Sequence, residues 1–141
     1  MNRRNFVKDG CQLCLLGTAA LALNGLTACS PVMGKAVKAD IVNNKLEIPL
    51  ALFEQKSTRI ISPRKYAYDI AAHKNPDNSF TTLLLRCTHM DNQLTPSNNG
   101  FYCSLHGSNF DKEGNVVKGP AERKLRQLKT EIIQNNLIIY L

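Results

Sequence analysis

Two short stretches of the chain decide its fold and chemistry: Cys87-Thr88-His89 and, 13 residues further on, Cys103-Ser104-Leu105-His106. Each stretch supplies one thiolate and one imidazole, separated by only one or two residues. A metal centre needs donor atoms that converge, and so short a gap within a loop lets both side chains of a pair point the same way. The pattern therefore predicts a metal site built from two loops.

Two kinds of metal centre fit this donor set. Two Cys and two His can hold a tetrahedral Zn²⁺ ion, although zinc sites more often pair like residues with like along the sequence. Here each stretch repeats the order Cys then His, which suits a two-iron cluster with both Cys on one iron and both His on the other. In an exported protein Cys87 and Cys103 could also form a disulfide, but the neighbouring histidine of each cysteine favours a metal.

The residues that follow extend the pattern well beyond the four donors. Gly107-Ser108-Asn109-Phe110-Asp111 comes directly after the second pair, and Gly114 and Gly119-Pro120-Ala121 follow. Over about 35 residues the chain resembles the Rieske family. The resemblance implies an all-β fold, a Rieske-like antiparallel β-sandwich with a small cluster-binding subdomain of two loops. It also implies one [2Fe–2S] cluster per chain, bound by Cys87, His89, Cys103 and His106.

The chain departs from part of this family at informative positions. Members from quinol-oxidising cytochrome complexes usually carry an extra Cys in each loop, joined as a disulfide, and Asn92 and Leu105 occupy those positions here. The same members place a Ser and a Tyr near the cluster sulfurs. Ser108 matches the Ser and is expected to bind the cluster by a hydrogen bond, whereas Phe110 has no hydroxyl to donate. Because such bonds stabilise the reduced state, we expect a midpoint potential below that of the quinol-oxidising group.

The N-terminal 29 residues are expected to be a targeting segment rather than part of the fold. The run Asn2-Arg3-Arg4-Asn5-Phe6-Val7-Lys8 resembles a twin-arginine export signal, and Leu26-Thr27-Ala28-Cys29 resembles a lipobox whose Cys29 is lipidated. Alternatively, the 18 mostly apolar residues from Cys11 to Ala28 remain as an uncleaved membrane anchor. Either interpretation predicts an exported, membrane-tethered domain that faces the periplasm or the cell exterior. Residues 30–40 are then a linker and residues 41–141 the Rieske domain.

Short β-rich runs separated by turn residues follow the linker. Turns are predicted at Asn43-Asn44, 75–78, 111–115 and 134–136, and residues 121–129 are expected to be mostly loop. Strands are predicted at 41–42, 45–48, 50–53, 58–61, 66–71, 80–85, 116–117, 131–133 and 137–141. A chain with 43% hydrophobic residues and no Trp is consistent with a small all-β domain.

The charge of the chain is moderately basic, with a net value of +7. From Cys29 onward there are 15 Lys and Arg against 10 Asp and Glu, an excess of +5. Such an excess attracts an acidic partner or an anionic membrane surface, or is ordinary solubility charge. No basic run with interleaved aromatic residues occurs, so nucleic acid is not an expected partner.

The predicted function is one-electron transfer, by a membrane-tethered carrier or by a subunit of a redox complex. The expected partner is a cytochrome, a quinol-oxidising complex or the large subunit of an oxidoreductase, and the chain is not expected to be an enzyme by itself. An alternative is the small Rieske subunit of an oxidase or oxygenase system, and a third is a structural zinc domain without redox activity. The remaining histidine, His73, has no Cys neighbour and is expected to lie at an edge or in solvent.

Overall fold

The computed structural model of the chain describes residues 34–141. The expected export signal, the lipobox and the lipidated Cys29 therefore lie outside the described residues. Within residues 34–141 no helix is both long enough and apolar enough to cross a membrane.

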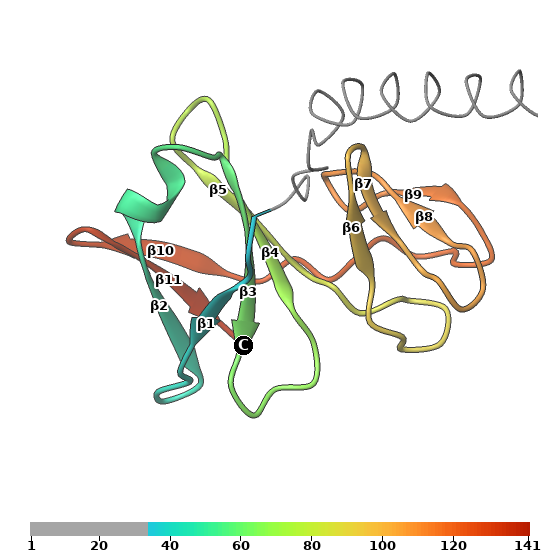
Figure 1. Cartoon of the computed structure of the whole chain (residues 1–141), viewed down its shortest axis with the longest axis horizontal. Helices are drawn as coiled ribbons and strands as arrows, with labels where there is room; N and C mark the ends of the chain where they lie inside the picture. The colour runs from blue at the N-terminus through green and yellow to red at the C-terminus, as the bar shows by residue number, and fades with distance from the viewer. Residues whose placement is uncertain (1–33) are drawn as a thin grey trace, which may run out of the picture. The chain divides into compact units, whose positions relative to one another are not determined.

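A four-stranded sheet forms one layer of the larger part of the domain (Figure 1). Its order is β1-β3-β4-β5, and its strands are β1 (Val37–Ala39), β3 (Thr58–Pro63), β4 (Ile70–Lys74) and β5 (Phe80–Leu84). The β3-β4-β5 part is antiparallel, whereas β1 pairs with β3 in parallel. Strand β5 carries the chain directly toward Cys87.

A three-stranded antiparallel sheet packs with the first one. Its order is β10-β11-β2, and its strands are β10 (Thr130–Ile133), β11 (Asn136–Tyr140) and β2 (Lys45–Pro49). Strand β2 alternates strictly, with Leu46 and Ile48 buried and their neighbours exposed. Both sheets contribute to one hydrophobic cluster, whose members include Leu46, Ile48, Ile61, Ile70, Leu137 and Ile139. These two sheets form the predicted β-sandwich.

The third sheet is set to one side of the other two in Figure 1. It is antiparallel throughout, with the strands β6 (Thr95–Ser97), β7 (Gly100–Tyr102), β8 (Asn109–Phe110) and β9 (Val116–Lys118) in sequence order. The first Cys/His stretch lies between β5 and β6, and the second lies between β7 and β8. This sheet and its loops form the predicted small subdomain.

Glycine is required at the start of β7. Gly100 has a φ angle of +145°, and a Cβ atom there would lie 2.0 Å from the carbonyl oxygen of Phe110. Any side chain would push β8 away from β7. Since β7 and β8 carry the second loop between them, Gly100 sets how closely the two strands that hold that loop can approach.

The all-β fold expected from the sequence is confirmed, with corrections in detail. Residues 50–53 were expected to form a strand, but Leu50–Phe53 is a 3₁₀ helix, η1, which follows Pro49 and buries Phe53 against Phe80 at 4.9 Å between ring centroids. A four-residue apolar run has no periodicity that separates a strand from a buried turn. The run 66–71 is also mostly irregular, with a bend at residues 67–68, because β4 begins only at Ile70.

The end of the expected linker also needs correction. Residues 37–39 were placed in the linker 30–40, but they form β1, whose Val37 pairs with Ile61 of β3. The folded domain therefore begins before residue 41. Most predicted turns are confirmed, and Asn43 and Asn44 both adopt positive φ angles of 51° and 60°, as expected for an Asn-Asn hairpin turn.

Candidate metal centre

The two Cys/His stretches form loops with the same backbone hydrogen bonds. In the first loop, residues 87–92, the N–H of Cys87 donates to the carbonyl of Asn92 at 2.8 Å, and the N–H of Asp91 donates to the carbonyl of Cys87 at 2.9 Å. Asp91 has a φ angle of 55°, which closes the turn. Each cysteine of the site is thus held at the start of a closed turn rather than on a free loop.

The second loop, residues 103–108, repeats this arrangement. The N–H of Cys103 donates to the carbonyl of Ser108 at 2.8 Å, and the N–H of Gly107 donates to the carbonyl of Cys103 at 2.9 Å. Gly107 has a positive φ of 80°, at the position where Asp91 has a φ of 55° in the first loop. The two loops therefore share one backbone arrangement, in which His89 is the third residue of the first loop and His106 is the fourth residue of the second.

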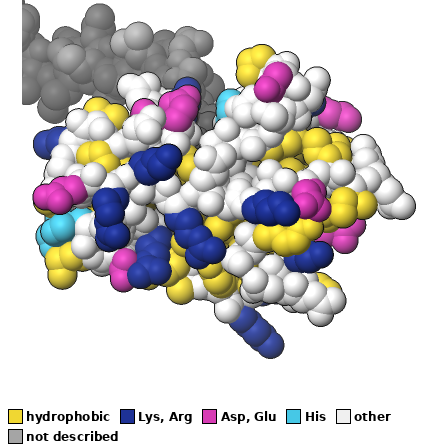
Figure 2. All heavy atoms as spheres, turned by 180° about the vertical axis from the view of Figure 1, so that it is seen from behind, with side chains coloured by type: hydrophobic (Ala, Val, Ile, Leu, Met, Phe, Trp, Pro, Cys, Tyr) yellow, Lys and Arg dark blue, Asp and Glu magenta, His cyan; other side chains and the backbone are white. Residues whose placement is uncertain are grey.

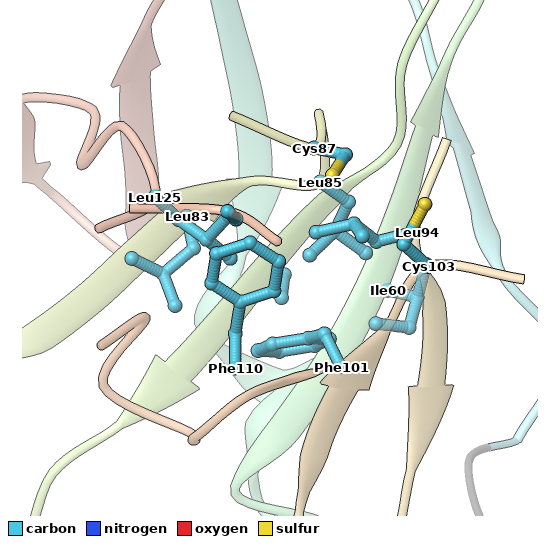
Figure 3. Packing of buried hydrophobic residues seen from close by; sticks show 11 residues of the cluster. Ile60, Leu83, Leu85, Cys87, Leu94, Phe101, Cys103, Phe110 and Leu125 are labelled. Atoms are coloured by element: carbon cyan, nitrogen blue, oxygen red, sulfur yellow. The ribbon is translucent and has the colours of Figure 1, made fainter. Parts of the chain in front are cut away.

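The two cysteines lie inside the subdomain. Cys87 is 0% and Cys103 is 1% exposed, and both belong to the hydrophobic cluster beneath the loops. In Figure 3 Cys87 lies above Leu85 and Cys103 lies beside Leu94, while Phe101 and Phe110 lie on the opposite side of the cluster. Both are free thiols, so they are not joined as a disulfide.

The two histidines form an outer pair. His89 and His106 are exposed, and their ring centroids are 5.0 Å apart with an interplanar angle of 88°. Each lies beside an exposed apolar side chain, Met90 at 61% and Leu105 at 62% exposure. The four expected donors are therefore arranged as a buried sulfur pair and an exposed imidazole pair.

Hydrogen bonds converge on the sulfur of Cys103. Burial raises the pKa of this thiol, but donors outweigh it and bring the pKa below its usual range: the backbone N–H groups of His106 and Leu105, the Asn92 amide and the Cys87 thiol. The Asn92 Nδ2 atom lies 3.6 Å from the Cys103 Sγ atom and joins the first loop to the second. These donors favour a thiolate at Cys103.

Ser108 joins the second loop to the Gly119-Pro120-Ala121 segment. Ser108 is completely buried, and its Oγ atom accepts a hydrogen bond from the N–H of Ala121 at 3.0 Å. The peptide bond between Gly119 and Pro120 is cis. The same segment is joined to the first loop further on, where the Thr88 hydroxyl donates to the carbonyl of Arg123. Residues 119–123 thus close the subdomain over both loops.

Comparison with known proteins identifies the fold family. The family model described as the Rieske [2Fe-2S] domain matches residues 37–129. The chain belongs to the Rieske [2Fe-2S] domain family. Domains of this family bind a [2Fe–2S] cluster and take part in Rieske-type electron transfer, so the predicted family, cofactor and general type of function are confirmed.

Known Rieske proteins resemble this chain over part of their length. Iron-sulfur subunit 3 of the cytochrome b6-f complex of Nostoc sp. is 34% identical over 59 residues, which are 40% of this chain and 33% of that protein. The mitochondrial Rieske subunit of the cytochrome b-c1 complex of Bos taurus is 28% identical over 91 residues, 61% of this chain and 32% of that subunit. The Rieske domain described here therefore matches about a third of the length of these relatives.

A solved structure covers more of the fold. The cyanobacterial plasma membrane Rieske protein PetC3 from Synechocystis superposes with a TM-score of 0.54 at 26% identity, covering 66% of this chain and 95% of that protein. The superposition agrees with the arrangement of sheets in this Rieske domain.

The donor atoms of the site fit a two-iron cluster. The four candidate ligands form two pairs of like donors, the thiols in the hydrophobic cluster and the exposed imidazoles, which is the donor set of a Rieske centre. His73 lies elsewhere, on β4, where its Nδ1 atom is 2.7 Å from the Thr58 hydroxyl.

Sequence reasoning missed two contacts of this Rieske domain. The sequence marks Asn92 only as a position that lacks the extra Cys, whereas in the structure its amide contacts Cys103 of the other loop. The bond between Thr88 and Arg123 spans 35 residues. No short sequence motif predicts either contact, because both depend on how the sheets bring the loops together.

Proposed function

We propose that Cys87 and Cys103 ligate one iron of the cluster and that His89 and His106 ligate the other. The observation that carries this proposal is the pairing of like donors by two equivalent loops, with the thiols buried and the imidazoles exposed. A [2Fe–2S] cluster bound in this way accepts and returns one electron.

The unequal burial of the four ligands indicates at which side of the site electrons are exchanged. The cysteines are sealed by apolar side chains that exclude water, so the sulfur side of the site does not reach the surface. The two imidazole edges reach solvent, flanked by Met90 and Leu105. We infer that a redox partner approaches the His89 and His106 edge, where apolar contact desolvates the interface.

Hydrogen-bond donors stabilise negative charge at the sulfur ligands. The backbone N–H groups of Leu105 and His106 and the Asn92 amide act on Cys103. Ser108 lies at the base of the second loop with its Oγ atom already accepting from Ala121. We propose that its hydroxyl proton donates to a sulfur of the bound cluster, which is the role that the sequence predicts for Ser108.

We further propose that the domain is exported and tethered to a membrane through lipidated Cys29, and that it exchanges electrons there with a cytochrome, a quinol-oxidising complex or an oxidoreductase large subunit. The twin-arginine-like run and the lipobox-like run support the export and the tether. A location at a membrane is also supported by the similar proteins. They are subunits of cytochrome b6-f and b-c1 complexes and a plasma membrane Rieske protein.

The ligand assignment is tested by electron paramagnetic resonance of the dithionite-reduced, cluster-loaded chain together with iron and zinc analysis. We expect two irons per chain and a rhombic signal typical of mixed Cys and His ligation. His106→Ala should abolish that signal, whereas His73→Ala, a histidine bonded to Thr58 outside the site, should retain it. Stoichiometric zinc without a signal, or loss of the signal in both variants, would contradict the assignment.

The tether is tested separately by membrane fractionation of cells that produce the full chain. The unsubstituted chain should be found with the membranes, and Cys29→Ser should change the mass and release the chain or leave its signal uncleaved. If the distribution of Cys29→Ser is unchanged and its mass differs only by the exchange of sulfur for oxygen, an uncleaved anchor is supported instead.

A further inference from the structure

A groove of about 310 Å³ lies beside the first loop of the site. Its buried floor includes Leu84 and Cys87, and Thr88 lies at its side. The remaining lining residues are all charged: Arg86, Asp91, Arg123, Lys124 and Arg126. The role proposed above for the four ligands does not use any of these charged side chains.

The groove has a strong positive charge. Four cationic side chains line it against a single carboxylate, that of Asp91. The Asp91 carboxylate forms a salt bridge with Arg86, whose Nε and Nη2 atoms donate to its two oxygens. Within residues 34–141, Arg123, Lys124 and Arg126 take part in no salt bridge. Three positive charges in the groove are thus left for a ligand.

The segment that carries these cations is held firmly against the domain. The N–H of Leu84 donates to the carbonyl of Arg126 at 2.9 Å, and the Thr88 hydroxyl donates to the carbonyl of Arg123. Leu125 and Leu128 are buried between the exposed cations. The positive charges are therefore presented from a fixed backbone. Figure 2 shows several Lys and Arg side chains on one face of the molecule.

We propose that this groove is the docking site for a carboxylate-bearing surface of an acidic redox partner protein. The proposal rests on the proposed function, because it places the partner beside the Cys87-Thr88-His89 loop, next to the exposed imidazole edge. A groove of one sign concentrates and orients an oppositely charged partner, which raises association rates. This assigns the positive excess of the chain to a defined surface instead of to general solubility.

The first test measures binding directly and does not depend on the cluster. A fluorescently labelled polyglutamate peptide is titrated into the full chain, and its anisotropy is followed at low and high salt. We expect saturable binding that weakens as salt screens the charges, and a loss of roughly tenfold or more in the Arg123→Glu/Lys124→Glu variant. The matched control is Lys56→Glu/Lys112→Glu, which makes the same change in net charge at two exposed lysines outside the groove.

The second test measures electron transfer by the reduced, cluster-loaded chain. Oxidation by the anion ferricyanide should slow in the groove variant, and oxidation by a cationic ruthenium hexaammine complex should not. The control variant should keep both rates near those of the unsubstituted chain.

If polyglutamate binding is normal but the cluster signal is absent, the proposed function fails and the groove remains a binding site. Equal losses in both variants would overturn the proposal in favour of net charge alone. Groove-dependent binding to anionic phosphatidylglycerol vesicles without polyglutamate binding would overturn it in favour of a membrane surface.

Discussion

Replacing Ser108 with Ala separates the hydrogen bond from Ala121 that the structure shows from the bond to the cluster that we propose for this side chain. Ser108 is fully buried, and its Oγ atom accepts from the N–H of Ala121 at 3.0 Å. Without the hydroxyl, that N–H is buried with no acceptor at this position, a loss of about 1–3 kcal/mol. Among the described residues the Ser108 Oγ atom accepts this bond and donates none, and the proposal assigns its proton to a cluster sulfur.

The expected change in midpoint potential follows from the strength of such a bond. A hydrogen bond to a charged acceptor contributes about 1.5–3 kcal/mol, and only the part that differs between the oxidised and reduced cluster changes the potential. Taking a third to a half of the bond as differential gives about 1 kcal/mol, which is about 40 mV for a one-electron couple. The reduced state is the more negative one, so Ser108→Ala should lower the potential.

The measurement is a potentiometric titration of the cluster-loaded full chain, followed by its visible spectrum. Hydrogen exchange of the peptide that contains Ala121 provides the second readout, and its protection should fall in Ser108→Ala. The matched control is Ser104→Ala, because Ser104 is exposed in the same loop. An unchanged potential in Ser108→Ala, or an equal shift in Ser104→Ala, would refute the assignment of the hydroxyl to the cluster.

Three further predictions concern contacts that hold the site together. Asn92→Leu removes the amide donor 3.6 Å from Cys103 Sγ and should lower the midpoint potential by about 20 mV, less than Ser108→Ala because the contact is long. Gly100→Ala places a Cβ atom 2.0 Å from a backbone oxygen of β8 and should cost about 3 kcal/mol or more, seen as loss of bound iron. Thr82→Val removes a buried hydroxyl bond of 2.8 Å to segment 123–129 and should cost about 1–2 kcal/mol in thermal unfolding.

Each of these variants has a control in the same chain. Asn98→Leu, on an exposed turn, should leave the potential unchanged, and Gly34→Ala should leave iron content unchanged because its nearest neighbour would lie at an ordinary 3.6 Å. The control for Thr82→Val is Thr95→Val, because Thr95 is exposed and its substitution should leave thermal unfolding unchanged. A normal iron content in Gly100→Ala would show that β7 and β8 can separate without loss of the site, contrary to the argument from their close approach.

The turns of the domain were predictable because the residues at them determine local backbone geometry. Asn43 and Asn44 take the positive φ angles that Asn tolerates, and they join β2 to the chain before it as expected. The strand predicted at 50–53 was wrong because burial, not local preference, decides the conformation of such a short apolar run. Phe53 reaches the core from a 3₁₀ helix by packing against Phe80, which lies 27 positions further along the chain.

The sequence by itself determined which Cys and which His come from the same loop, since the two residues are only one or two positions apart. Only the tertiary structure decided how the pairs meet. The sheets bring the two loops together, so that Asn92 reaches Cys103 and Ser108 reaches Ala121. They also place segment 123–126 beside Arg86, which creates the basic groove. These contacts depend on strand register and long-range packing, whereas a motif depends only on neighbours in the chain.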